Sequence, residues 1–76
     1  MTPYLNLSGD SNVLAYRIAI GSITVEFRTG STRFYEYTDQ SAGAAAVKEM
    51  QQLARQGRGL NAFISTTVRF GYARKW

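Results

Sequence analysis

Residues 13–27 constrain the fold more than any other stretch of the chain. Apolar residues alternate with polar or small ones on both sides of the Gly21-Ser22 dipeptide, and such alternation is typical of β-strands. A glycine followed by a small residue favours a two-residue type II′ turn, so the stretch predicts a β-hairpin. This turn sets three apolar pairs across the strands: Ile20 with Ile23, Ile18 with Val25, and Tyr16 with Phe27. On the other face the same register places Arg17 opposite Glu26.

A third strand is predicted around Tyr35-Glu36-Tyr37, where aromatic residues follow a turn-forming segment. The length of the preceding loop decides which face of this strand is buried. A loop with an even number of residues would place Glu36 beside Val25 on the buried face, which is costly for a charged group. A three-residue loop with Gly30 at positive φ instead places Tyr35 beside Val25 and continues the apolar face through Tyr37. We therefore expect the odd-numbered loop, with both tyrosines mostly buried against a helix.

The spacing of apolar residues predicts a main helix over residues 42–56. Its apolar face consists of Ala46, Val47, Met50, Leu53 and Ala54. Thr38, Asp39 and Ser41 are the candidate N-caps. Gly57 is well placed to end the helix as a left-handed C-cap.

A short second helix is predicted beyond the Gly57-Arg58-Gly59 link, because apolar residues recur there at helical spacing. These residues are Leu60, Phe63 and Ile64. Residues 66–70 are β-branched or aromatic and favour a short edge strand, and residues 71–76 have the composition of a tail.

These elements predict an α+β fold, in which a three-stranded antiparallel β-meander is packed by one main helix and a short second helix. The order is β-β-β-α-α, with the short C-terminal strand as an addition. The expected strands cover residues 13–20, 23–28 and 33–38. We expect a single domain over residues 11–72, a loose N-terminal arm over residues 1–10 and a basic C-terminal tail over residues 73–76.

The composition excludes several classes of function. The 76-residue chain has no cysteine and no histidine, so it has no disulfide, no thiolate metal site and no histidine base. Its acidic residues show no spacing that implies paired acid–base roles; they are Asp10, Glu26, Glu36, Asp39 and Glu49. No segment has the pattern of a secretory signal or the length of a membrane span. We therefore expect a soluble cytoplasmic protein that is not an enzyme, with no catalytic residue, no cofactor, no metal and no membrane partner.

Positive charge is concentrated in the second half of the chain. The net charge is +4, and from Met50 onward there are five basic residues and no acidic one. A basic half attracts polyanions such as nucleic acid or an acidic protein surface. The candidate nucleic-acid-binding residues are Arg55, Arg58, Arg69, Arg74 and Lys75 for phosphates, Asn61, Tyr72 and Trp76 for bases, and Arg33 at the rim of the sheet.

Two motifs in this order point to a family. Tyr35-Glu36-Tyr37 forms a Y-x-Y triplet after the hairpin, and the glycine link leads into a helix that contains Asn61, Phe63 and Ile64. This order resembles the KTSC domain family, which is named for the C-terminus of some lysyl-tRNA synthetases and also occurs in free-standing bacterial and phage proteins. The resemblance covers about residues 9–72 and implies this α+β fold and RNA binding, the latter through the family's attachment to a tRNA synthetase.

The chain departs from the family pattern at two places. Asp39-Gln40-Ser41 stands where the family often has a proline before the helix. Leu60 stands where many members have an aromatic residue, which removes one stacking side chain.

The first functional hypothesis is therefore a nucleic-acid-binding module, for RNA rather than DNA. The alternative is a protein-interaction module that docks through an edge strand or through the outer sheet face around Arg17, Arg28 and Phe34. Binding to phosphates weakens steeply with salt, whereas docking of an apolar surface does not, so salt dependence separates the two hypotheses. The oligomeric state and any base preference stay open at this point.

Overall fold

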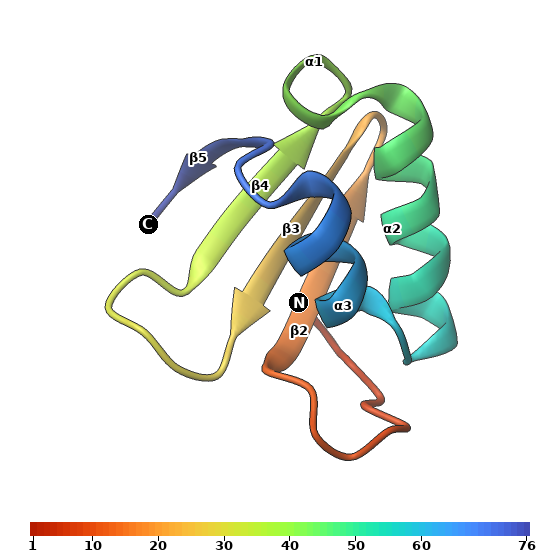
Figure 1. Ribbon diagram of the computed structural model, residues 1–76, viewed down its shortest axis with the longest axis vertical. Helices are drawn as coiled ribbons and strands as arrows, with labels where there is room; N and C mark the ends of the chain where they lie inside the picture. The colour runs from red at the N-terminus through yellow and green to blue at the C-terminus, as the bar shows by residue number, and fades with distance from the viewer.

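The computed structural model covers residues 1–76 and contains a five-stranded antiparallel sheet with helices against one face (Figure 1). The strands lie in the order β1-β2-β3-β4-β5, and every neighbouring pair is antiparallel. The elements are β1 (Thr2–Pro3), β2 (Val13–Ala19), β3 (Ser22–Phe27), β4 (Phe34–Thr38), α1 (Asp39–Ala42), α2 (Ala44–Gln56), α3 (Leu60–Phe63), the π-helix η1 (Ile64–Val68) and β5 (Tyr72–Lys75). The predicted α+β class is confirmed, with more strands than expected. No helix is both long enough and apolar enough to cross a membrane.

The β2–β3 hairpin is present, but its predicted register was wrong by two residues. Ile18 pairs with Ile23, and Arg17 lies opposite Thr24 rather than Glu26. The turn residues are therefore Ile20 and Gly21, and the Ile20 side chain is fully exposed. The predicted apolar pairs do not form. The same set of side chains still faces the helices, because a shift of two residues leaves every side chain on its original face of the sheet.

Gly21 explains why the turn moved. Its φ is 70°, while Ile20 keeps a negative φ, and positive φ at the second turn residue fits a type II rather than a type II′ turn. The turn is also held from outside, because the Asp39 N–H donates a hydrogen bond of 3.0 Å to the Gly21 carbonyl. The sequence pattern around residues 20–23 contains no sign of this distant contact.

The pairing of β3 with β4 follows the prediction. Val25 lies opposite Tyr35 and Ile23 opposite Tyr37, as an odd-numbered loop requires, and Gly30 has a φ of 110°. The loop is longer than the three residues predicted, because the strand pairing ends at Glu26 and Phe34. Tyr37 is buried with 1% of its surface exposed, while Tyr35 is only half-buried. The expectation of burial therefore holds fully for Tyr37 and partly for Tyr35.

The main helix is divided in two. Thr38 caps α1, where its side chain accepts a hydrogen bond from the Ser41 N–H, and the Ser41 hydroxyl bonds back to Thr38. Gly43 has a φ of 96° and separates α1 from α2. Gly57 ends α2 in the left-handed conformation, as predicted. The side chains that α2 buries are Val47, Met50 and Ala54.

The C-terminal region differs most from expectation. Residues 66–70 do not form an edge strand, because the helix continues through η1 to Val68. The edge strand is β5 instead, formed by residues that we expected to be a tail, and it pairs with β4. Tyr72 drives this pairing, since its ring packs edge to face against Tyr35 at 5.2 Å and Tyr37 at 6.5 Å between ring centroids.

The N-terminal residues are also held in place. Thr2 and Pro3 pair with β2 as the opposite edge strand. Tyr4 is buried, and its hydroxyl oxygen accepts a hydrogen bond of 3.3 Å from the Leu60 N–H. The arm that we expected to be loose therefore joins the sheet to the start of α3.

Replacement of Gly57 by alanine should destabilise the protein more than the same change at Gly59. Both residues have a φ of 81°, so each alanine carries a left-handed cost of about 1–2 kcal/mol. An added Cβ at Gly57 would lie 2.6 Å from the Leu5 Cβ, whereas at Gly59 the nearest atom is the Leu53 Cδ2 at 3.5 Å. Urea unfolding of the two variants checks this. Equal losses would mean that the N-terminal segment does not pack on Gly57.

Candidate functional site

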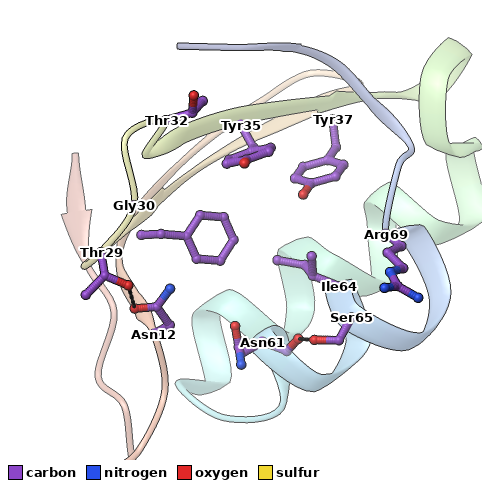
Figure 2. Close-up of a pocket in the computed structure, with 11 residues that line it drawn as sticks. Asn12, Thr29, Gly30, Thr32, Tyr35, Tyr37, Asn61, Ile64, Ser65 and Arg69 are labelled. Atoms are coloured by element: carbon purple, nitrogen blue, oxygen red, sulfur yellow. Dashed lines mark hydrogen bonds between the residues drawn. The ribbon is translucent and has the colours of Figure 1, made fainter.

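A cavity of about 310 Å³ opens between one end of the sheet and the α3–η1 segment (Figure 2). Strand ends and the β3–β4 loop form one side, and residues of α3 and η1 with Arg69 form the other. The lining residues are Asn12, Phe27, Thr29, Gly30, Thr32, Tyr35, Tyr37, Asn61, Ile64, Ser65 and Arg69. The volume lies at the lower end of the range of small-ligand sites.

Aromatic rings form the sheet side of this cavity. Phe27 packs edge to face on Tyr35 at 5.3 Å between centroids, and Tyr72 continues the row towards Tyr37. Phe27 and Tyr35 are only half-buried, so part of each ring faces the open space. The cavity therefore offers aromatic surface that the protein itself does not cover.

The hydroxyl of Tyr37 points into the cavity, although its ring is buried (Figure 2). This hydroxyl makes no hydrogen bond to another group of the chain. Because every fully buried side-chain polar atom in the protein has a partner, the unpartnered Tyr37 oxygen must be reachable from the cavity. Burial, with smaller contributions from Tyr35 and Tyr72, raises the pKa of Tyr37 above its usual range. The hydroxyl therefore stays protonated at physiological pH and can donate a hydrogen bond.

Two asparagines line the cavity on the side that faces the tyrosines (Figure 2). The Asn12 Oδ1 accepts a hydrogen bond of 3.1 Å from the Thr29 hydroxyl, which leaves the Asn12 Nδ2 group free to donate. The Asn61 side chain makes no hydrogen bond within the chain, while its main-chain carbonyl accepts one of 2.8 Å from the Ser65 hydroxyl. Both asparagines that line the cavity thus keep a free Nδ2 donor, and the Asn61 amide is free at both ends.

Arg69 is the one charged residue that lines the cavity. The protein has a single ion pair, between Arg74 and Glu36, so the Arg69 guanidinium has no carboxylate partner. The wide π-helical turn brings Ile64, Ser65 and Arg69 to the same side of the segment, and π-helical turns are frequent at functional sites. The site therefore has a net positive charge and no acid that could neutralise it.

Of the predicted site residues, Asn61 and Arg69 line the cavity, and two more lie close by. Tyr72 belongs to the aromatic row, and the Lys75 Nζ lies 5.3 Å from the Tyr72 ring centroid. Residues of the helix after the glycine link and of the C-terminal segment thus lie near one another at this end of the sheet.

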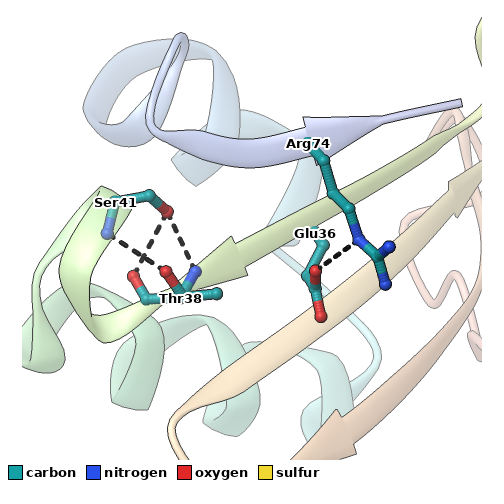
Figure 3. Close-up of polar contacts among 4 residues, drawn as sticks. All are labelled: Glu36, Thr38, Ser41 and Arg74. Atoms are coloured by element: carbon teal, nitrogen blue, oxygen red, sulfur yellow. Dashed lines mark hydrogen bonds and ion pairs between the residues drawn. The ribbon is translucent and has the colours of Figure 1, made fainter.

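Arg74 and Trp76 lie on the other face of β4, away from the cavity. The Arg74 Nε donates a hydrogen bond of 2.8 Å to the Glu36 Oε1 (Figure 3), and Glu36 alternates with the inward tyrosines. The Trp76 ring stacks on Phe34 at 5.7 Å, with Arg74 4.9 Å from the Trp76 centroid. These contacts fasten β5 to β4.

The remaining predicted arginines do not gather at the cavity. Arg55 lines a separate hollow with Arg17 near β1, and Arg58 is exposed in the glycine link. Arg33 is exposed beside the cavity rim, where its N–H donates to the Trp76 carbonyl. Gly57 itself is buried beneath Leu5, so its backbone does not face an open site.

Several lining residues gave no usable signal in the sequence. Asn12, Thr29 and Thr32 stand in loops between strands and reach the cavity only through the hairpin pairing. Ser65 follows Asn61 by four residues, a helical spacing that could have linked the two.

Comparison of the chain with protein-family models, with curated proteins and with solved structures found no match. The resemblance to the KTSC family therefore stays a proposal, and the geometry of the site carries the functional argument.

Alkaline pH should destabilise the protein through Tyr37. Its folded-state pKa lies above the unfolded value of about 10, so its contribution to stability is complete below that pH and is lost as pH rises towards the folded-state pKa. In that window each pH unit removes up to about 1.4 kcal/mol per such group. Urea unfolding at a series of alkaline pH values should show a shallower decline for Tyr37→Phe than for the parent. Tyr16→Phe is the matched control. An unchanged decline in Tyr37→Phe would mean that the phenol is freely solvated.

Proposed function

We propose that the protein is a small non-catalytic module that binds single-stranded nucleic acid, RNA rather than DNA, in the cytoplasm. One observation carries the proposal: the cavity combines a guanidinium without a carboxylate partner, two amides with free donors and partly uncovered aromatic rings, and no carboxylate lines it. Each of these features has a counterpart in a nucleotide.

The charge selects an anion as the ligand. A guanidinium donates paired hydrogen bonds to phosphate oxygens, and Arg69 has no carboxylate partner in the chain, since its guanidinium lies instead over the Phe70 ring at 5.3 Å. The five acidic residues all lie outside the lining, so nothing in the cavity repels a phosphate. Lys75 and the exposed Arg33 add positive charge near the same end of the sheet.

The rings and amides select a flat heterocycle. Protein aromatics stack on unpaired bases, and amide side chains hydrogen-bond to base edges. In duplexes the base edges are paired and stacked, so a cavity of this kind suits a base from a single strand. Sequence-specific recognition of RNA mostly uses such unpaired bases, which favours RNA over DNA. The resemblance to the KTSC family supports the same choice.

The site lacks the groups that hydrolytic or acid–base chemistry needs. Glu36 is held by Arg74 on the opposite face of the sheet. No group of three or more acidic side chains lies close enough to hold a metal ion. Tyr37 stays protonated, so it serves as a hydrogen-bonding group rather than as a general base at neutral pH.

A protein-interaction module is the second candidate, and the outer side of β5 favours it. β5 is an edge strand of the sheet, so it can accept another strand alongside it. Trp76 keeps 49% of its surface exposed beside this edge although it stacks on Phe34. Partner binding at this edge would depend on Trp76 and little on salt.

Arg69→Gln tests the first proposal. The parent should bind short single-stranded RNA with an affinity that falls log-linearly with salt, and the variant should bind about tenfold more weakly at low salt, since a hydrogen bond to a charged group contributes about 1.5–3 kcal/mol. Loss of one phosphate contact should make the salt slope shallower by about 0.7. Fluorescence anisotropy of a labelled RNA measures both quantities.

Lys48→Gln is the charge-matched control. Lys48 is exposed on α2 beside the Gly21 turn, at the opposite end of β3 from the cavity. It should change the affinity much less than Arg69→Gln does. Equal effects of the two variants would mean that the RNA is held by the overall positive charge of the protein and not by a contact at the cavity. Absence of RNA binding by the parent at low salt would reject the proposal in favour of the protein-interaction module.

A further inference from the structure

We infer that the free edge of β5 is a docking site for an extended peptide, which adds to the sheet as an antiparallel strand and carries an apolar residue followed by an acidic one. This edge is a different surface from the cavity. The inference therefore gives the partner of the second candidate function its chemistry and does not rest on RNA binding.

The two edges of the sheet differ in what they offer to another strand. β1 has only two residues, and one of them, Pro3, has no N–H to donate. β5 has four residues and no proline, and its residues after Tyr72 are all exposed. An uncovered edge of this kind is the part of a sheet to which a further strand can add.

The backbone of Lys75 directs its hydrogen-bonding groups away from the sheet. The next residue, Trp76, exchanges two hydrogen bonds of 2.9 Å with Phe34 at the start of β4. Bonded and non-bonded pairs alternate along an antiparallel ladder, so Lys75 and the opposite Tyr35 form a non-bonded pair. The Lys75 N–H and carbonyl are therefore free to bond to one residue of an incoming antiparallel strand, and they fix its register.

The side chains at this edge determine what the incoming strand must carry. Trp76 lies with Phe34 on the outer face and keeps 49% of its surface exposed, so it favours an apolar neighbour. Lys75 is exposed on the other face, where its Nζ lies 5.3 Å from the Tyr72 ring centroid, and it has no carboxylate partner. An acidic side chain opposite Lys75 would complete a cross-strand pair of opposite charge.

The direction of the incoming strand sets the order of these two residues. An antiparallel partner runs opposite to β5, so its residue beside Trp76 precedes its residue beside Lys75 in the partner's sequence. The partner therefore carries an apolar residue directly followed by aspartate or glutamate.

A second copy of this chain is a poor occupant of the same edge. Two β5 strands paired through Lys75 would place the two ammonium groups next to each other, and like charges at such positions are destabilising. Arg33, whose N–H donates to the Trp76 carbonyl, is exposed and adds positive charge close by. Lysine on an edge strand commonly protects a protein against self-association. The charge of this edge thus repels its own copy and suits an acidic segment.

Titration of the whole isotope-labelled protein with a capped peptide, followed by nuclear magnetic resonance, tests the inference. The probe is Ser-Thr-Ile-Glu-Gln-Thr-Ser. The amide signals of β5 should shift, including that of Lys75, while those of Asn61 and Ser65 at the cavity should stay in place. A control peptide with isoleucine and glutamate exchanged should bind about fivefold more weakly, because its acidic residue would meet Trp76 and its apolar residue would meet Lys75.

N-methylation of the peptide tests the backbone contact itself. A methyl group on the glutamate nitrogen removes the N–H that bonds to the Lys75 carbonyl, so binding should weaken about tenfold. A methyl group on the following glutamine nitrogen, whose N–H points away from β5, should change the affinity much less.

A charge exchange tests the side-chain contact. Lys75→Glu should weaken binding of the probe about fivefold, and a peptide with lysine in place of its glutamate should regain the loss. The regained binding also shows that the variant folds. Lys48→Glu introduces the same charge at an exposed position of α2 and should leave the preference between the two peptides unchanged.

The results that overturn the inference leave RNA binding untouched. Equal affinity for the two peptide orders, or equal effects of the two methyl positions, would overturn strand addition at β5. Shifts spread over all exposed basic residues, or no shifts at low salt with millimolar peptide, would overturn it as well. Binding of RNA at the cavity is measured separately, so either proposal can fail while the other stands.

Discussion

The edge-to-face packing of Tyr72 against Tyr35 and Tyr37 joins the C-terminal strand to the rest of the molecule. Pairs of this kind contribute about 0.5–1.5 kcal/mol each beyond the area that they bury. A four-residue edge strand has few ladder hydrogen bonds of its own, so side-chain packing decides whether it adds to the sheet. Ser41 reinforces the join from α1, because its hydroxyl donates a hydrogen bond of 2.6 Å to the Gly71 carbonyl. With β5 held at one end and α3 at the other, the π-helical segment between them carries Arg69 to the cavity.

The same aromatic row also accounts for the cavity. Met50 of α2 fills the centre of the core together with Val25 and Tyr37, all of which are buried almost completely. Phe27 and Tyr35 lie at the margin of this core and are covered only in part. Rings that face open space contribute less to stability than buried rings do. This loss is large for a small domain, because its core buries little apolar surface in total. Their exposure beside free amides and a free guanidinium is therefore more consistent with a binding surface than with incomplete packing.

Local chemistry made part of the structure predictable. The parity of the β3–β4 loop followed from the cost of burying Glu36, and the end of α2 followed from Gly57. The hairpin register depended instead on the Asp39 contact with Gly21, and β5 depended on Tyr72 meeting two rings far away in the sequence. We grouped Arg69 with Arg55 and Arg74 in the sequence because of their charge. In the fold, Arg69 lines the cavity, Arg55 lines a separate hollow and Arg74 pairs with Glu36. Asn12 was missed because a loop asparagine has no pattern until the strands are paired.

This separation of the basic residues changes what the net charge can do. Nine basic side chains attract a polyanion from any direction and raise the rate of encounter, but only contacts made in one place at one time add to a specific affinity. At the cavity, Arg69 is the one lining cation, so under the proposed function a bound strand would gain few close phosphate contacts and its affinity would depend on the groups that touch the base. Selectivity at such a site comes from a mismatch that leaves a buried donor unpaired. Under the proposed function, the side chains that line the cavity therefore matter more for recognition than the count of arginines does.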